Sequence, residues 1–165
     1  MEMSEIKPTK YRGLAIAFAA MVFTLDQLSK WLILEKILAP DHAYIGITSF
    51  FNVALVWNSG VSFGMFAGSR QPLLLTCISA LIVAILLIWL YKNSSKLVAV
   101  ALGCVIGGAV GNMIDRLRFG AVTDFLDFHL GSHHWPAFNI ADSSIFIGVV
   151  LLCISSMFTS DNTNP

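Results

Sequence analysis

Four apolar segments, each close to the length that a helix needs to cross a bilayer, constrain the fold of this chain more than any other feature. They cover residues 13–34, 72–91, 97–114 and 140–158. A bilayer core is spanned by a helix of about 20 predominantly apolar residues. Charged residues make up only 12% of the sequence, against about 25% in an average soluble domain. We therefore predict an all-α membrane protein with four transmembrane helices.

Charge and cysteine content exclude several classes of protein. The sequence has 10 basic and 10 acidic residues and a formal net charge of +0, so it offers no basic surface for nucleic acid. Its three cysteines, Cys77, Cys104 and Cys153, lie inside apolar segments and have no CxxC spacing. Neither a disulfide framework nor a zinc site is expected from them.

The distribution of basic residues predicts the orientation. Basic residues gather on the cytoplasmic side of membrane proteins. Five lie before the first segment or between the second and third, and four lie on the opposite side; the two groups are Lys7, Lys10, Arg12, Lys92 and Lys96, and Lys36, Arg70, Arg116 and Arg118. We expect both termini in the cytoplasm and the connections 35–71 and 115–139 outside. The basic residues before the first segment and the apolar run from Leu14 to Leu25 resemble the start of a signal peptide. No polar, small-residue cleavage zone follows, so this helix is predicted to be uncleaved.

The first outer connection contains a strand pattern. Large apolar residues recur at every second position, and they are Phe51, Val53, Leu55 and Trp57. Asn58-Ser59-Gly60 then supplies turn residues. We predict a small extracytoplasmic β-sheet on the outer membrane surface, within a β-rich segment at about residues 43–68. The whole chain, residues 1–165, is predicted to form a single domain.

Three glycines recur at intervals of four in the third segment, at Gly103, Gly107 and Gly111. Small residues at this spacing let membrane helices approach closely. A nucleotide-binding glycine loop would need a preceding strand and a soluble βαβ unit. The pattern therefore favours helix packing.

Ionisable residues inside a membrane segment are costly and usually mark a functional site. Asp26 and Lys30 are four residues apart in the first segment, so they share one face of the helix. Two interpretations stay open. The two residues form a mutually neutralising buried pair, or Lys30 extends toward the outer interface while Asp26 supports a polar site.

Two further carboxyl groups come from different parts of the chain, yet both are expected at the outer boundary. Asp142 opens the fourth segment, and Asp124 follows the third. Singly, Asp142 is explained as a helix N-terminal carboxylate with Asn139 as its N-cap, and Asp124 as a solvated loop carboxylate. Two carboxylates at a partly dry site would share a proton, as in aspartic proteases. Together with three neighbouring polar groups, Asn58, Asn112 and Arg116, the pair favours catalysis.

The histidines give a weaker signal. His129, His133 and His134 have spacings that would suit a metal site on a helix. Gly131 and Pro136 predict a loop instead, and no further ligand pattern accompanies them. We predict no metal site and assign these histidines no role. His42 carries no signal, and Asp41 and Asp127 are interpreted as exposed loop charges.

Five motifs, in this order along the chain, resemble those of the lipoprotein signal peptidase (signal peptidase II) family, the aspartyl peptidases of the bacterial inner membrane. The motifs are DQLSK at 26–30, NSGVSF at 58–63, GNMIDR at 111–116, VTDF at 122–125 and FNIAD at 138–142. The expected length, number of spans and topology agree with that family.

The resemblance implies roles for individual residues. Asp124 and Asp142 would be the catalytic dyad, and the supporting positions would be Asp26, Lys30, Asn58, Gly60, Asn112, Arg116, Asn139 and Ala141. It also implies a diacylglyceryl-modified prolipoprotein substrate, cleaved just before the modified cysteine, with no metal or organic cofactor. We expect a monomer in contact with membrane lipids, with its site at the outer face of the inner membrane. The alternative is a small proton- or ion-coupled transporter with an intramembrane Asp and Lys relay.

Overall fold

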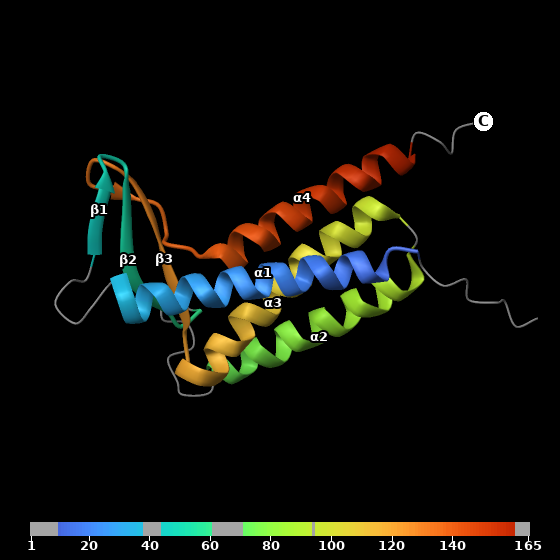
Figure 1. The fold of residues 1–165 in the computed structure, drawn as a ribbon, viewed down its shortest axis with the longest axis horizontal. Helices are drawn as coiled ribbons and strands as arrows, with labels where there is room; N and C mark the ends of the chain where they lie inside the picture. The colour runs from blue at the N-terminus through green and yellow to red at the C-terminus, as the bar shows by residue number, and fades with distance from the viewer. Residues whose placement is uncertain (1–9, 38–43, 61–70, 94, 161–165) are drawn as a thin grey trace, which may run out of the picture.

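Four long helices and a small antiparallel sheet form the described part of the chain (Figure 1). The computed structural model describes residues 10–37, 44–60, 71–93 and 95–160. The helices are α1 (Arg12–Leu32), α2 (Gln71–Lys92), α3 (Lys96–Phe119) and α4 (Ile140–Ser160), and a π-helical turn, Ile33–Ile37, continues α1. Each of these four helices is long and apolar enough to cross a membrane. The predicted membrane architecture is confirmed.

Helix α3 runs five residues beyond the end of the apolar segment at residue 114. The helix ends where Gly120 adopts a left-handed conformation (φ 71°) and donates its N–H to the carbonyl of Arg116. Glycine adopts this conformation at little cost and commonly ends helices in this way. The polar residues at the end of α3 therefore end the apolar pattern but not the helix, and this extension carries Asp115 and Arg116.

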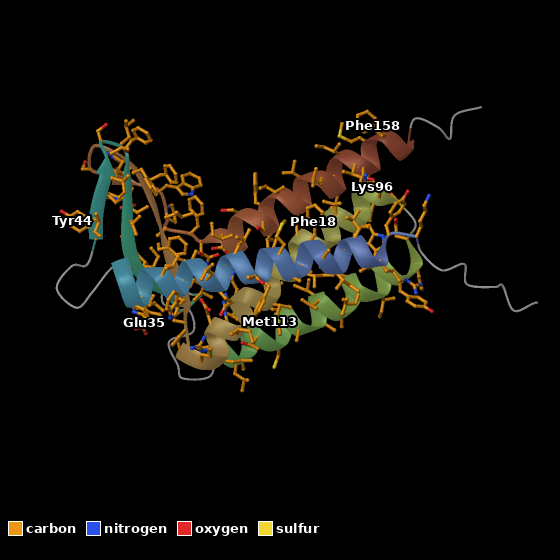
Figure 2. The ribbon with its side chains drawn as sticks, in the orientation of Figure 1. Phe18, Glu35, Tyr44, Lys96, Met113 and Phe158 are labelled. Carbon is orange, nitrogen blue, oxygen red and sulfur yellow. The ribbon has the colours of Figure 1, made fainter. Side chains whose placement is uncertain are left out.

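Helix α3 is the centre of the bundle. In its membrane-spanning part 67% of the residues are buried, against 11% in α2 and in α4. The sheet lies at one end of the bundle, and the start of α1 lies at the other end, beside the connection from α2 to α3 (Figure 1). Figure 2 shows Lys96 and Phe158 at the end away from Tyr44, which is on the sheet. Residues at the two ends of each helix thus face opposite sides of the membrane.

The sheet combines strands from both long connections. Its order is β1 (Tyr44–Thr48), β2 (Phe51–Asn58), β3 (Val122–Leu130) and β4 (His133–His134), with every pair antiparallel. The predicted strand at 51–57 is confirmed. The prediction of a loop around Asp124 was wrong, because this residue lies in β3 and pairs across to Val56. Residues 61–68 of the predicted β-rich segment lie outside the described residues.

The glycines of α3 lie where α1 passes closest. A Cβ atom added to Gly103 would lie 2.5 Å from the carbonyl oxygen of Ala15, and one added to Gly107 would lie 2.5 Å from that of Ala19. At Gly111 the nearest atom would be Asp26 Oδ2, also at 2.5 Å. These separations leave no room for a side chain, so the predicted role of the glycines in helix packing is confirmed.

A methyl group at Gly107 should therefore destabilise the protein. We expect Gly107→Ala to lower the free energy of unfolding by about 1–3 kcal/mol, because the backbone of α1 would have to move. The matched control is Gly13→Ala, since a Cβ at Gly13 meets nothing within 4 Å. Thermal unfolding in detergent micelles measures both variants. Equal stability of Gly107→Ala and the wild type would contradict this account of the packing.

Candidate active site

The two candidate carboxylates are brought together at the sheet end of the bundle by Asn139. Asn139 Nδ2 donates to Asp124 Oδ1 at 2.7 Å. Asn139 Oδ1 accepts from the backbone N–H of Asp142 at 2.9 Å, and the N–H of Asn139 donates back to Asp142 Oδ2 at 3.3 Å. This reciprocal pair is a capping box at the start of α4. One asparagine thus fixes the helix start and connects Asp124 with Asp142.

Two further asparagines complete the set of donors. Asn58, at the end of β2, donates to Asp124 Oδ2 at 2.9 Å, and Asn112 of α3 donates to Asp142 Oδ1 at 2.8 Å. Asn58 Oδ1 in turn accepts the N–H of Gly60 at 2.8 Å. Gly60 has φ 84°, a conformation that favours glycine. Each of the four carboxylate oxygens of Asp124 and Asp142 therefore accepts an N–H.

Burial changes the acidity of Asp124. The residue is 1% exposed. Burial, as the largest cause, raises its pKa to about 6, and the negative charge of Asp142 acts in the same direction. The hydrogen bonds from Asn58 and Asn139 and the charge of Lys30 oppose this rise. A group with this pKa can hold a proton close to neutral pH, as a general acid must.

Next to the two carboxylates lies a buried ionic cluster made of Asp26, Lys30 and Asp115. Lys30 Nζ contacts Asp26 Oδ2 at 2.8 Å and Asp115 Oδ2 at 3.0 Å, and Lys30 is 3% exposed. The interpretation in which Lys30 extends to the interface was wrong, because both of its carboxylate partners are buried; the neutralising pair with Asp26 is present. Asp26 Oδ1 also accepts the backbone N–H of Ala141 at 3.0 Å. Ala141 therefore connects the ionic cluster to α4 through its main chain.

Asp115 and Gln27 were not among the predicted site residues. Asp115 Oδ2 accepts the backbone N–H of Thr123 at 3.0 Å and so joins α3 to β3. Gln27 Nε2 donates to Asp115 Oδ1 at 3.1 Å and to Asp26 Oδ2 at 3.2 Å. Asp115 follows Asn112 by three residues, so helical spacing would have placed both on one face. That spacing was one available signal, and the motifs GNMIDR and DQLSK, which contain Asp115 and Gln27, were another.

Arg116 lies close to the site without forming an ion pair. Its Nη1 donates to the carbonyl oxygen of Asn112 at 3.5 Å. Among the residues described, no carboxylate oxygen lies within 4.0 Å of its guanidinium nitrogens. Its charge nevertheless acts on Asp142, Asp124 and Asp115. Arg116 thus contributes positive charge to the surroundings of both candidate carboxylates.

The histidines form a separate cluster on the sheet. His134 Nδ1 lies 2.8 Å from Asp127 Oδ1, and Asn52 Nδ2 donates to Asp127 Oδ2 at 2.9 Å. His129 stacks on His134 with ring centroids 4.9 Å apart. The interpretation of Asp127 as an exposed loop charge was wrong: it is 8% exposed, in β3. Burial opposes ionisation, but the hydrogen bonds from Asn52 and His134 and the histidine charges hold the pKa of Asp127 below its usual value.

Neither this cluster nor the main site forms a metal centre in the described ranges. No three His, Cys, Asp or Glu side chains there converge on a common point that would suit an ion.

An apolar groove opens beside Asp142. Its volume is about 420 Å³, and its lining residues are Trp135, Phe138, Asp142, Ser143, Phe146 and Ile147. Trp135 and Phe146 are 69% and 70% exposed. Asp142 is the one ionisable residue in this lining. A hydrophobic ligand in the groove would lie directly against this carboxylate.

Comparisons with known proteins give one consistent result. Residues 18–158 match the family model for signal peptidase (SPase) II. The chain is 42% identical to the lipoprotein signal peptidase of Rhizorhabdus wittichii, over 94% of this chain and 92% of the relative, and 39% identical to that of Rhodopseudomonas palustris, over 87% and 92%. A solved bacterial membrane enzyme is similar to the structure with a TM-score of 0.79 and 30% identity, over 92% of each chain. A second one has a TM-score of 0.75 and 31% identity, over 87% of this chain and 92% of the other.

Proposed function

Because the chain belongs to the signal peptidase II family of aspartic-type signal peptidases, we propose that Asp124 and Asp142 are its catalytic dyad. One observation carries the assignment: two carboxylates from separate segments share Asn139 and have an N–H donor on every oxygen. The supporting residues in this proposal are Asp26, Lys30, Asn58, Gly60, Asn112, Arg116, Asn139 and Ala141. Asp115 and Gln27 join them through the ionic cluster.

The different surroundings of the two carboxylates support different roles. Asp142 borders the groove, where a water molecule and a peptide bond can enter. In its ionised form it takes a proton from the water as the water oxygen bonds to the scissile carbonyl carbon. Asp124, buried and with its pKa raised to about 6, holds the resting proton and donates it toward the carbonyl oxygen. When the intermediate collapses, the C–N bond breaks and the proton taken by Asp142 passes to the leaving amine. The C=O bond re-forms as its oxygen returns the other proton to Asp124.

The groove beside Asp142 supports the proposal that the substrate carries lipid. The proposed substrate is a prolipoprotein cleaved just before its diacylglyceryl-modified cysteine. Four of the six lining residues are apolar, and three of these, Trp135, Phe146 and Ile147, are exposed, which suits a peptide whose reacting residue carries acyl chains. All of the proposed site residues come from one chain, so a monomer would suffice.

A cleavage assay tests this function. We expect the purified protein in detergent micelles to cut a synthetic lipobox peptide carrying the diacylglyceryl group, and to leave the same peptide without that group nearly intact. Product mass identifies the bond that is broken. Equal cleavage of both peptides would contradict the proposed substrate, and cleavage of neither would contradict the activity.

The transporter alternative lacks support. Transporters of this kind place their carboxylates near the bilayer midplane, in repeated halves. Here the candidate dyad lies at the junction of α4 with the sheet, at one end of the bundle. The family to which the chain belongs is a peptidase family.

The orientation is a further part of the proposal, with both termini in the cytoplasm and the sheet outside the inner membrane. In a variant without the three native cysteines, we expect a cysteine at Ser132 to react with an impermeant maleimide added to intact cells. A cysteine at Ser94, which lies between α2 and α3 in sequence, should react only after the membrane is permeabilised. The reverse pattern would invert the topology.

A further inference from the structure

The side-chain amide of Asn112 lies between a cation and a candidate catalytic carboxylate. Its Oδ1 accepts from Lys30 Nζ at 3.0 Å, and its Nδ2 donates to Asp142 Oδ1 at 2.8 Å. An ammonium group has donors only, so the carbonyl oxygen of the amide must be the atom that faces Lys30. The NH₂ group must then face Asp142. The chemistry of Lys30 thus fixes the direction of this amide.

Lys30 is itself held in one position. Its ammonium nitrogen donates to Asp26 Oδ2 at 2.8 Å and Asn112 Oδ1 at 3.0 Å, and forms an ion pair with Asp115 Oδ2 at 3.0 Å. The structure shows no hydrogen bond from Lys30 to Asp124 or Asp142 among the described residues. Any effect of Lys30 on the reaction must therefore pass through another group or act over a distance.

Asn112 differs from the other two asparagines in what fixes it. Backbone N–H groups hold the carbonyl oxygens of Asn58 and Asn139. The oxygen of Asn112 has one further donor, Asn139 Nδ2 at 3.2 Å, but that group also donates to Asp124 at 2.7 Å. The orientation of Asn112 therefore depends mainly on one side-chain charge.

We propose that Lys30 is a positioning residue for the peptidase reaction, which holds the Asn112 amide so that its NH₂ group faces Asp142. The NH₂ group favours the ionised form of Asp142, the form that accepts a proton from water. If the amide turned over, its oxygen would face a carboxylate oxygen and disfavour that form. The proposal rests on the assignment of Asp142 as the base.

A direct charge effect of Lys30 has to be separated from this positioning role. Several charged groups surround Asp142, and they come from three elements: Asp26 and Lys30 on α1, Asp115 and Arg116 on α3, and Asp124 on β3. Removal of the Lys30 charge alone would also disfavour an ionised Asp142. A double-mutant cycle distinguishes the two routes, because only the positioning route requires Asn112.

The cycle consists of Lys30→Gln, Asn112→Leu and the double variant, with the pH dependence of kcat/KM as the readout. The acid limb is the part of this profile in which kcat/KM falls at low pH. We expect each single change to shift the acid limb to higher pH by about one unit. The double variant should move it no further than the larger single change. Additive shifts would overturn the proposal. The matched control is Asn52→Leu, which removes an asparagine amide from a carboxylate outside the site, Asp127 Oδ2 at 2.9 Å, and should leave the acid limb in place.

A measurement on the unmodified residues covers the case in which Lys30→Gln does not fold. In protein labelled with ¹⁵N-asparagine, the Asn112 side-chain NH₂ signals, assigned by their loss in Asn112→Leu, should shift with pH in step with the acid limb. The shift should vanish in Asp142→Asn. Signals that stay constant through that pH range would overturn the proposal. Failure of the dyad itself would appear differently, as retained cleavage by Asp142→Asn.

Discussion

Replacement of either proposed catalytic aspartate by asparagine should abolish cleavage while the protein still folds and inserts. Asparagine keeps the shape of the side chain but neither accepts the proton from water nor donates one to the carbonyl oxygen. Proton transfer by a positioned group contributes about 10²–10⁴-fold to a reaction rate. We expect Asp124→Asn and Asp142→Asn each to lower kcat by at least that factor in the assay with the lipidated peptide.

The matched control is Asp127→Asn. Asp127 lies on the same strand as Asp124 and also accepts an asparagine amide, but it contacts His134 and lies outside the proposed site. Its replacement should leave kcat within a few-fold of the wild type. Substantial turnover by either dyad variant, with normal accumulation, would refute the assignment.

The second large effect concerns pH. Because the pKa of Asp124 is raised to about 6 by burial, this group is protonated below that pH and ionised above it. Catalysis by the scheme above needs the protonated form. kcat/KM should therefore fall as the pH rises through about 6, approaching tenfold per pH unit.

Asn58 provides a test of this limb. Asn58→Leu removes a hydrogen bond that favours ionised Asp124, so the alkaline limb should move upward by about one pH unit. Asn52→Leu is a close control, because Asn52 donates to Asp127 at 2.9 Å, the same distance as Asn58 to Asp124. It should leave the limb unchanged. A downward shift in Asn58→Leu would contradict the protonated state assigned to Asp124.

Infrared difference spectroscopy locates the resting proton independently. The carboxylic acid C=O band should disappear in Asp124→Asn and persist in Asp142→Asn. Loss of the band in Asp142→Asn alone would reverse the two roles. The two carboxylates interact, so the wild-type titration belongs to the pair.

The helices could be predicted from sequence because the bilayer demands a long apolar run, and each run is local in the chain. Strand β3 could not be predicted in the same way. Its sequence, Val122–Leu130, places polar residues on both faces, because Thr123 and Asp127 lie on one face of the strand and Asp124 on the other. Such a strand has no period of two in hydropathy. Its position depends on pairing with β2, about 70 residues earlier in the chain.

The candidate site shows the same limit. Asp124, Asp142 and the asparagines stood out as polar groups at segment boundaries, and motif resemblance assigned their roles. The partner of Lys30 on the facing helix did not stand out, because Asp115 is 85 positions away from it in the sequence and reads as the end of an apolar run. An interpretation based on α1 alone therefore allowed Lys30 to extend toward the outer membrane interface. Contacts between distant segments decide where a buried charge is neutralised.

The glycine contacts between the helices also limit the path by which a substrate could reach the proposed dyad. Gly103 and Gly107 bring α3 against the backbone of α1, and Gly108 and Gly148 do the same between α3 and α4. These seams are too narrow for a hydrocarbon chain. In the proposed function, a lipid-anchored peptide would instead diffuse in the plane of the bilayer to the groove beside Asp142. The encounter is thus two-dimensional, so adding inert lipid at constant bulk substrate concentration would slow cleavage by surface dilution.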